Sequence, residues 1–486
     1  KNKNIMRNIY LKISFLSLML IAIAGCGDFL DVNTNPNKTA DASLNTLTPT
    51  ILYYSAVNTY SAANVSNQYC QQIGSVSPGL TDAQLRSTYD VLWSNIYLNV
   101  IPNANAMIKK AESTNSPHYS GIAKVVIAYN LGLGTAVWEN IAYSAADNQL
   151  SNLSPAYDSQ EDIYKSIQKL LDEAIVELSE PTSISKPATD DIVFKGVIAN
   201  WVKTAYTLKA RYLLKKKKKT GAASYDAIAD ALSKGFKSNA DDFQLVFTDK
   251  NFSPFFATAL ANNTGNVTTT FSATYMNMMN GTVQEIVDPR VSLISYKTST
   301  TDPIYKGVAP GAGSGSNTVY NDKTNFYGWH FRLLAPLQML TYAEAKFIEA
   351  EALYLKNGNV ASAEAQAAYV EGIKANMSKI GVAAADITTF TSHVKVNPSV
   401  ENLTISNIMV EKFKALFMNP EAWTDVRRYN YDANVFPGMA LPANHNIDLN
   451  GNWIQRGAYP DSEVSRNGDV ATQNFKNLDA KMWIFN

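Results

Sequence analysis

Residues 325–358 constrain the fold more than any other stretch of the chain. We expect residues 333–356 to form a helix, because one set of apolar residues recurs there at steps of three and four: Leu340, Ala343, Phe347, Ala350 and Tyr354. A second apolar stripe lies beside the first: Tyr342, Ala345, Ile348 and Ala352. A helix with two apolar stripes is covered on two sides, which predicts a bundle or a solenoid of helix pairs.

The two ends of this stretch differ in character. Asn357 and Gly358 are typical of a helix end, since glycine adopts the left-handed conformation that follows the last helical turn. Upstream of the helix, an aromatic cluster stands among glycine and asparagine and is more typical of a loop: Phe326, Tyr327, Trp329 and Phe331. We therefore expect a scaffold helix preceded by an aromatic loop.

The N-terminal residues have the pattern of a secretion signal. Four cations, Lys1, Lys3, Arg7 and Lys12, precede a short apolar run at 13–24, which is too short to span a bilayer. The sequence Ile-Ala-Gly-Cys then ends at Cys26 and resembles a bacterial lipobox, in which the cysteine carries the lipid anchor. The alternative is an ordinary signal peptide in which Cys26 is incidental. We interpret residues 1–25 as a lipoprotein signal peptide and residues 26–49 as a lipidated tether.

The remaining residues, 50–486, are interpreted as one domain. Its helical scaffold is expected at 50–240 and 333–420, and its loop-rich portions at 241–332 and 421–486. The helices expected from periodicity cover residues 51–69, 85–110 with a break at Pro102, 122–138, 163–178, 193–219, 362–378 and 401–418. Alternation of Phe243, Leu245 and Phe247 predicts a short strand. No later stretch has the roughly 18 uninterrupted apolar residues of a membrane span.

Charge gives little indication of a nucleic-acid partner. Lys and Arg together number 42, as do Asp and Glu, so no net field attracts an anion. Five consecutive lysines, 215–219, admit two readings: a patch for nucleic acid or acidic lipid, or a solvated helix end whose cations suit the helix dipole. The second is favoured, because no aromatic residues are interleaved with the lysines.

No catalytic or metal motif is recognisable. The four histidines, His118, His330, His393 and His445, have no metal-ligand spacing, and Cys70 is expected to be a partly buried free thiol. The run from Asp448 to Asn452 resembles the start of a calcium loop but lacks its final glutamate, so a turn is the better interpretation. Carboxylates are numerous, and the sequence leaves a glycosidase pair open.

Aromatic residues are the strongest indication of a ligand. The chain has 26 Tyr and 7 Trp, and rings in Asn-rich loops are suited to stack on sugar rings. The alternative is that the rings fill the helical core, which is favoured for rings on predicted helices such as Trp201. The candidate ligand-binding residues are Trp329, Tyr327, Tyr305, Tyr320, Tyr89 and Trp93.

Nine motifs in collinear order resemble the SusD/RagB-like nutrient-binding outer-membrane lipoproteins, in particular the SusD-like branch. They are the lipidated start at Cys26, Trp93 with Tyr97 and Asn105, the segment 138–145, the run Tyr157 to Ile175, the run Asp191 to Arg211, Asp288-Pro289-Arg290, Ala343-Glu344 with Glu351, Glu421-Ala422-Trp423 with Asp425 and Arg427-Arg428, and Tyr459-Pro460 with Glu463 and Asn467. The chain departs from the family pattern around Trp138, where the usual glycine, aspartate and proline are replaced, and at Glu411-Lys412-Phe413.

The resemblance implies a mainly α fold, in which about four tetratricopeptide-like helix pairs form a right-handed superhelix with large loop-rich insertions and a few short β-hairpins. It also implies a cell-surface lipoprotein, at the exterior of the outer membrane, that passes an oligosaccharide or a peptide to a SusC-like TonB-dependent transporter. No cofactor, metal or covalent chemistry is implied. The motif residues are expected to be packing residues. A peptide-binding relative or a surface glycosidase remain the alternatives.

Overall fold

The computed structural model describes residues 6, 42–146, 152–297, 304–313 and 324–486. Contacts divide the chain into two units, Lys1–Ser43 and Leu44–Asn486, and the account below concerns the second. Two predicted site residues, Cys26 and Tyr320, lie outside the described residues.

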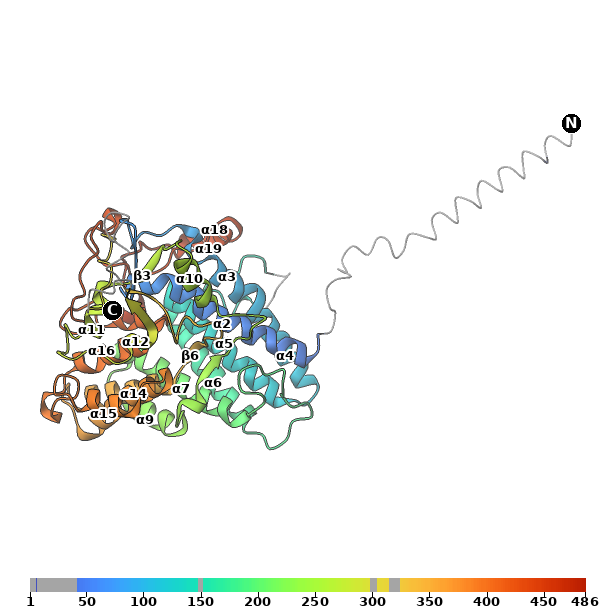
Figure 1. Ribbon diagram of the computed structural model, residues 1–486. Coiled ribbons are helices and arrows are strands. Elements are labelled where there is room, and N and C mark those ends of the chain that lie inside the picture. The colour runs from blue at the N-terminus through green and yellow to red at the C-terminus, as the bar shows by residue number, and fades with distance from the viewer. Residues whose placement is uncertain (1–5, 7–41, 147–151, 298–303, 314–323) are drawn as a thin grey trace. The chain divides into compact units, whose positions relative to one another are not determined.

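The second unit is mainly helical (Figure 1). Its helices are α2 (Leu44–Tyr69), α3 (Asp90–Ser94), α4 (Ile101–Ser113), α5 (Pro117–Trp138), α6 (Gln160–Leu178), α7 (Ile198–Lys215), α8 (Lys217–Thr220), α9 (Ala223–Lys234), α10 (Pro254–Asn263), α11 (Ala273–Met279), α12 (Val291–Ile294), α13 (Tyr342–Lys356), α14 (Ala363–Ile380), α15 (Ala384–Ser392), α16 (Ile405–Ala415), α17 (Glu421–Arg428), α18 (Asp461–Arg466) and α19 (Gly468–Gln473). Short 3-10 turns cover Arg86–Tyr89, Asn239–Asp241, Val400–Asn402, Ile447–Leu449 and Trp483–Phe485.

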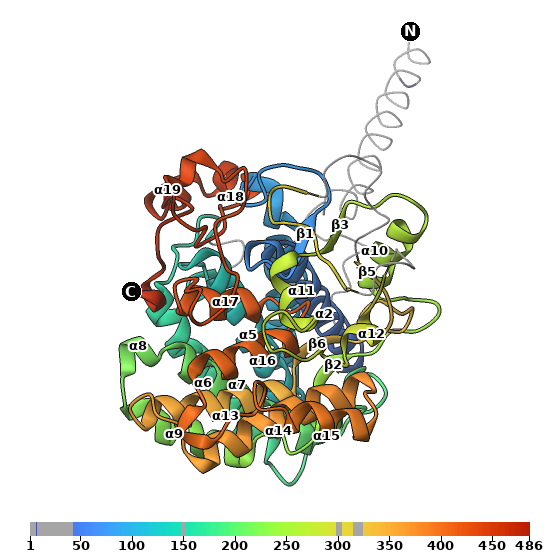
Figure 2. The ribbon, with the colours of Figure 1, turned by 60° about the vertical axis from the view of Figure 1, so that its left-hand side comes forward.

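Neighbouring helices in the sequence stack on one another in space. Helix α4 packs on α5, α5 on α6, α6 on α7 and α7 on α9, and α13 packs on α14. Helix α9 also contacts α13, so the stack continues across the 241–332 insertion (Figure 2). The predicted tetratricopeptide-like scaffold is therefore confirmed. The buried face predicted for α13 is confirmed as well, since Ala343, Phe347, Ala350 and Tyr354 are all buried.

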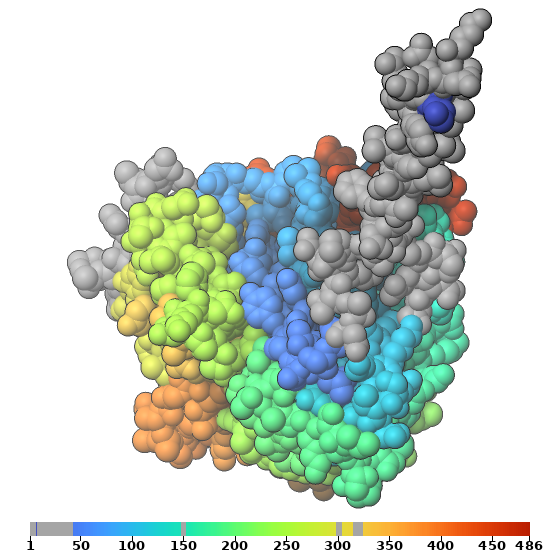
Figure 3. All heavy atoms as spheres, turned by 90° about the vertical axis from the view of Figure 1, so that its right-hand side faces the viewer, coloured from blue at the N-terminus to red at the C-terminus, as the bar shows by residue number. Residues whose placement is uncertain are grey.

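Helix α5 is the centre of the scaffold. By length and composition it is the one helix among the described residues that could cross a membrane, but nearly all of its residues are buried inside this unit. Close packing depends on its glycines: a Cβ on Gly132 would lie 2.0 Å from the hydroxyl oxygen of Tyr212 on α7. Helix α2 packs on α5 and lies between α10 and α4 in the space-filling view (Figure 3).

Three pairs of short strands occur among the described residues, and two of them join segments that are distant in the sequence. Strand β1 (Ile73–Ser75) pairs with β3 (Thr269–Phe271), β2 (Phe243–Leu245) with β6 (Leu337–Leu340), and β4 (Ser295–Lys297) with β5 (Thr324–Phe326), all antiparallel. The strand predicted at Phe243 is confirmed. The β1–β3 and β2–β6 pairs attach the insertion to the scaffold, whereas β4 and β5 pair within the insertion.

The helix predicted at 333–356 begins later in the structure, at Tyr342. Residues 337–340 form β6, because their backbone pairs with β2 and Pro336 disfavours helical geometry in the residue before it. The helix starts after Thr341, whose side chain accepts a hydrogen bond from the backbone N–H of Glu344. It ends as predicted, with Gly358 at a φ of +69°.

Other boundaries also differ from the prediction. Helix α2 begins at Leu44 rather than at residue 51, so the end of the predicted tether is helical. No break occurs at Pro102, because a π-helical segment, Asn95–Val100, leads into α4 and places the proline in its first turn. The loop-rich portions contain α10, α11 and α12 and also α17, α18 and α19, which are too short to give a clear period.

The lysine run is not a uniformly solvated helix end. Lys215 is buried and its ammonium lies 2.6 Å from Glu421. Lys217 lies against the ring of Tyr429, Lys218 donates to the carbonyl of Phe485, and Lys219 lies over the ring of Trp483. The run therefore binds the C-terminal segment to the scaffold, and the favoured solvated interpretation is wrong for Lys215.

A network of buried charges connects α7, α13, α16 and α17. Its members are Arg211 and Lys215 on α7, Glu344 and Glu351 on α13, Lys412 on α16, and Glu421, Asp425 and Arg428 on α17. Arg428 binds Glu351 through two nitrogens at 2.7 and 2.9 Å, and the Tyr429 hydroxyl donates to the same carboxylate at 2.8 Å. Burial by itself raises the pKa of Glu351, but the charges of Arg428 and Lys412 hold it well below its usual value.

We expect Glu351→Gln to destabilise the fold by about 3–5 kcal/mol, since it leaves the buried Arg428 and Lys412 to share the single carboxylate of Asp425. The matched control is Glu161→Gln, whose exposed carboxylate lies 2.9 Å from Lys165 and should contribute less than about 1 kcal/mol. Urea unfolding of both variants measures the difference. Equal midpoints for the two variants would contradict a structural role for the network.

Candidate functional site

Most of the aromatic loop that the sequence favoured as a ligand site is core. Phe326 and Phe331 are buried and stack with their ring centroids 4.3 Å apart. Phe331 also contacts Phe271 and Phe417, from β3 and the end of the α16 region. The rings fill the contact between the insertion and the scaffold, so they are not available to a ligand.

The prediction that Trp329 binds the ligand is wrong for this structure. Its side chain is only 8% exposed and lies 4.8 Å from the ring of His330, with the Arg332 guanidinium 5.3 Å from the indole. Burial, with Lys379 and Arg332 nearby, lowers the pKa of His330 to about 3, so the imidazole stays neutral. The turn is clamped to α12, because a Cβ on Gly328 would lie 1.9 Å from the carbonyl oxygen of Leu293. Trp329 is therefore a packing residue in this structure.

The prediction that Tyr89 and Trp93 bind the ligand is also wrong. They are 2% and 6% exposed, and both pack on Trp138, with centroid distances of 5.9 and 4.9 Å. Tyr97 covers Trp93 further at 4.6 Å. No face of either ring is open to a sugar, so these two rings belong to the core beneath the loops.

Two of the predicted tyrosines remain accessible. Tyr327 is 57% exposed and meets the edge of Tyr296 at 5.9 Å. Tyr305 is half-buried, with the Lys297 ammonium 5.2 Å from its ring. Tyr327 directly follows β5, which lies at the opposite side of Figure 2 from α18 and α19. The structure therefore does not gather the predicted rings into one site.

A groove among the loops is the better candidate site. Its volume is about 420 Å³, and it is lined by Leu80, Ala83, Gln84, Arg86, Asn446, Asp448, Leu449, Arg456, Gly457, Ala458, Tyr459, Phe475, Lys476, Asn477 and Leu478. One wall is the loop at 80–86, another is the turn at 446–449, and a third follows α19. This volume is in the range of small-molecule sites, and the lining mixes apolar and hydrogen-bonding groups.

The loop at 80–86 is fixed to the rest of the groove by two side chains. The side-chain amide of Gln84 pairs with the backbone of residues 456–458: it donates to the carbonyl of Arg456 at 3.1 Å and accepts from the N–H of Ala458 at 3.0 Å. The buried Asp82 carboxylate accepts from His445 Nδ1 at 2.5 Å and from the N–H of Asn446 at 3.0 Å. Hydrogen bonds therefore fix the loop at 80–86 to the segments at 445–446 and 456–458.

Glu139, at the end of α5, binds residues that form the floor of the groove. This buried carboxylate accepts from Arg456 and Lys476, each at 2.8 Å, and from the N–H of Trp483 at 2.5 Å. Burial by itself raises the pKa of Glu139, but the Lys476 hydrogen bond and the Arg456 charge outweigh burial and lower the pKa. Gly457 packs closely on α5, since a Cβ there would lie 2.5 Å from the side chain of Val137.

Loops from three parts of the chain meet beside the groove at Gly311. Its carbonyl accepts from the N–H of Gly79 and from the side chain of Asn444, each at 3.0 Å. Gly311 has a φ of +76°, and a Cβ there would lie 1.7 Å from the carbonyl oxygen of Ala443. The insertion therefore supports the same loop face that forms the groove.

Catalytic arrangements are not apparent at the groove. The His445–Asp82 pair resembles part of a catalytic triad, but His445 Nε2 is buried and has no hydrogen-bond partner among the described residues. Within those residues, no three His, Cys, Asp or Glu side chains are grouped to hold a metal. Burial raises the pKa of the Cys70 thiol, which makes it a poor nucleophile.

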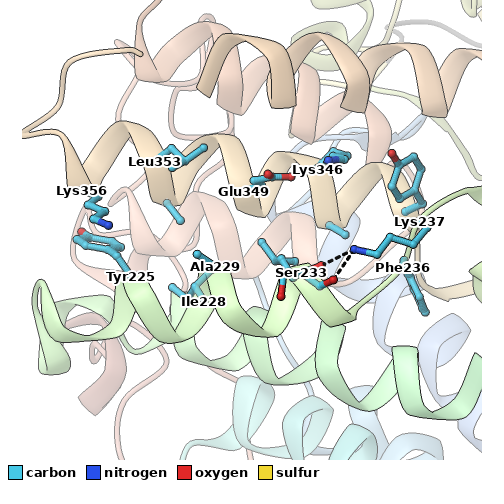
Figure 4. Close-up of a pocket in the computed structure, with 14 residues that line it drawn as sticks. Tyr225, Ile228, Ala229, Ser233, Phe236, Lys237, Lys346, Glu349, Leu353 and Lys356 are labelled. Atoms are coloured by element: carbon cyan, nitrogen blue, oxygen red, sulfur yellow. Dashed lines mark hydrogen bonds and ion pairs between the residues drawn. The ribbon is translucent and has the colours of Figure 1, made fainter. Parts of the chain in front are cut away.

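A second cavity, of about 190 Å³, lies between α9 and α13 (Figure 4). Ile228 and Ala229 from α9 face Leu353 from α13 across an apolar floor. At one end, the Lys237 ammonium donates to the carbonyls of Leu232 and Ser233 at the end of α9. Lys346 is paired with Glu349 and Lys356 with Asp226, so this cavity offers less for a polar ligand than the groove.

Sequence reasoning missed Phe475 and the loop at 80–86. Phe475 is 64% exposed and Leu80 is 55% exposed, and both line the groove. A signal was present, because Phe475 is a single aromatic residue in the polar run Gln-Asn-Phe-Lys-Asn, which gives it no apolar neighbours to be buried with. That Phe475 and Leu80 line the same groove depends on tertiary structure.

Comparison with known proteins gives one family and many similar structures. The family model SusD-like_2, described as starch-binding associating with outer membrane, matches residues 34–460. A structure named as a chitin-binding protein is 22% identical, with a TM-score of 0.75 and coverage of 90% of this chain and 98% of the other. A chitin-binding SusD homolog from Flavobacterium johnsoniae is 20% identical, with a TM-score of 0.74 and coverage of 90% and 97%. A SusD homolog from Bacteroides uniformis is 18% identical, with a TM-score of 0.74 and coverage of 90% and 99%. No curated protein sequence matches the chain.

We expect Gln84→Ala to loosen the groove wall without unfolding the protein. Losing two hydrogen bonds, each contributing about 1 kcal/mol, should raise amide exchange at 80–86 and 456–458 by roughly tenfold or more. Hydrogen-exchange mass spectrometry measures this, with the exposed Gln473→Ala as the control. If exchange at both segments were unchanged, Gln84 would not hold the wall.

Proposed function

Because this chain belongs to the SusD-like family, we propose that it is an outer-membrane lipoprotein that binds an oligosaccharide without transforming it and delivers it to a SusC-like TonB-dependent transporter. The protein would be anchored through Cys26 and face the cell exterior. The observation that carries glycan binding is the loop groove, which combines the exposed Phe475 ring with amide and charged side chains.

The carboxylates at the groove support binding rather than hydrolysis. A glycosidase places two carboxyl groups on either side of the bond that it cleaves. Asp448 is the one carboxylate among the described residues that line the groove. Glu139 and Asp82 lie behind the lining and are occupied by the ion pair with Arg456 and the hydrogen bonds of the 445–446 turn.

The relatives support a carbohydrate as the ligand class. Two of the similar structures are named as chitin-binding, and the family description names starch. Chitin and starch oligosaccharides are both built of rings with apolar C–H faces and hydroxyl edges. A groove that combines an aromatic ring with hydrogen-bonding side chains suits both.

The sequence supports the anchor and the partner. Cys26 follows an apolar run and two small residues, as in a lipobox, and a lipid chain there would hold the protein at a membrane surface. A SusC-like transporter is the partner implied by the collinear motifs from Trp93 to Asn467. The proposed role is capture at the surface followed by transfer.

The ligand class is tested with the full-length protein in detergent, titrated calorimetrically with starch, chitin, xylan and mannan oligosaccharides and with mixed peptides. We expect saturable binding of at least one oligosaccharide, with no new reducing ends after prolonged incubation. Binding confined to peptides would assign the protein to the peptide-binding alternative, and release of reducing ends would make it a glycosidase.

The anchor is tested by fractionating cells that express Cys26→Ala. We expect this variant to leave the membrane fraction, because the thioether that carries the lipid cannot form. Cys70→Ala is the matched control and should remain with the membranes, since Cys70 is buried in the folded unit. Cys26→Ala that still sediments with membranes would reject the lipid anchor.

A further inference from the structure

We propose that Phe475 is the stacking platform of the groove and that the groove selects uncharged oligosaccharides over acidic ones. This inference rests on the proposed glycan-binding function and specifies the substrate class and the residue that recognises it. It depends on three features of the groove: an exposed ring on an anchored backbone, a second wall that is fixed, and cations that are already paired.

The residues on both sides of Phe475 are anchored, and its ring is exposed to solvent. Its own N–H donates to the carbonyl of Thr472 in α19, at 3.2 Å. The preceding Asn474 accepts from the side chain of Asn140 at 2.9 Å, and the following Lys476 donates to Glu139 at 2.8 Å. The backbone is therefore anchored before and after a ring that is 64% exposed. An aromatic face fixed in water is ready to bind the apolar face of a sugar ring without ordering a loop first.

The loop at 80–86, which also lines the groove, is fixed as well. Leu80 is 55% exposed and stands at the start of the loop that Asp82 and Gln84 bind to the turn at 445–446 and to the floor. The groove between the two walls has a volume of about 420 Å³. An exposed apolar side chain on each wall gives two contacts for the C–H faces of a sugar chain. Asn446 and Asn477 also line the groove, and their amides can bind hydroxyl groups.

Each cation that lines the groove faces a carboxylate. Among the described residues of the lining, the cations are Arg86, Arg456 and Lys476. Arg86 lies 3.6 Å from Asp461, and Arg456 and Lys476 both lie 2.8 Å from Glu139. Asp448 is the one carboxylate among the described lining residues, and it adds a negative charge outside these pairs.

An acidic glycan would therefore gain little at this site. To bind a uronate or a sulfate, Arg456 or Lys476 would have to turn away from Glu139, and this buried carboxylate would keep only one of its two cations. The carboxylate of Asp448 would repel the same anion. A neutral glycan requires neither change, and its hydroxyls can donate to Asp448 and accept from Arg86.

The test is calorimetric titration of the full-length protein with neutral oligosaccharides of starch, chitin, xylan and mannan and with acidic ones of galacturonan, alginate and chondroitin sulfate. We expect the tightest ligand to be neutral. For that ligand, Phe475→Ala should weaken binding roughly tenfold, as truncation of a central aromatic anchor does. Phe475→Tyr should keep most of the affinity.

The matched control is Phe252→Ala, which removes another exposed ring, 47% accessible, from the segment before α10. It should leave the affinity unchanged, and thermal unfolding of both variants checks that each is folded. Wild-type affinity in Phe475→Ala, or an acidic glycan as the tightest ligand, would overturn this inference while leaving glycan binding intact. Failure of the wild-type protein to bind any glycan in the panel would overturn the proposed function and this inference together.

Discussion

The buried charge network between α7, α13, α16 and α17 is the interaction on which the rest of the structure depends. Ions removed from water are costly unless each finds a partner in good geometry. Arg211 meets this condition by binding Glu344 through two nitrogens, at 2.7 and 2.6 Å, and Arg428 by binding Glu351 in the same way. Such pairs tolerate only one relative position of the helices, so they fix the register of the stack as well as its contacts.

A second network of the same kind fixes the insertion to the scaffold. Arg290 binds Asp288 at 2.6 Å and Glu411 of α16 at 2.6 Å, and Lys414 of α16 joins both carboxylates. Burial by itself raises the pKa of Asp288, but the charges of Arg290 and Lys414 lower it to about 2. A third set, around Glu139, fixes the C-terminal segment to α5. The loop groove lies on this third set, so a rigid core supports a site made of loops.

The sequence predicted the scaffold better than the site, for a physical reason. The buried face of a helix such as α13 is predicted by the local period of its apolar residues, and Phe347 and Tyr354 are buried as that period requires. An aromatic residue in a loop has no such period. Trp329 and Phe475 both stand in irregular segments, but Trp329 meets Lys379 of α14 and is buried, whereas Phe475 is 64% exposed. Only the path of distant segments distinguishes the two.

The sequence by itself determined the class of fold, the order of the main helices and the family, because helical periodicity and motifs such as Asp288-Pro289-Arg290 are local patterns. It also indicated the lipidation motif at Cys26. Tertiary structure decided which rings are core, that residues 337–340 pair with β2 instead of extending α13, and that 80–86 and 475–478 form one groove. These outcomes depend on contacts between segments hundreds of residues apart, such as that of Gln84 with Arg456, and no local pattern encodes such a contact.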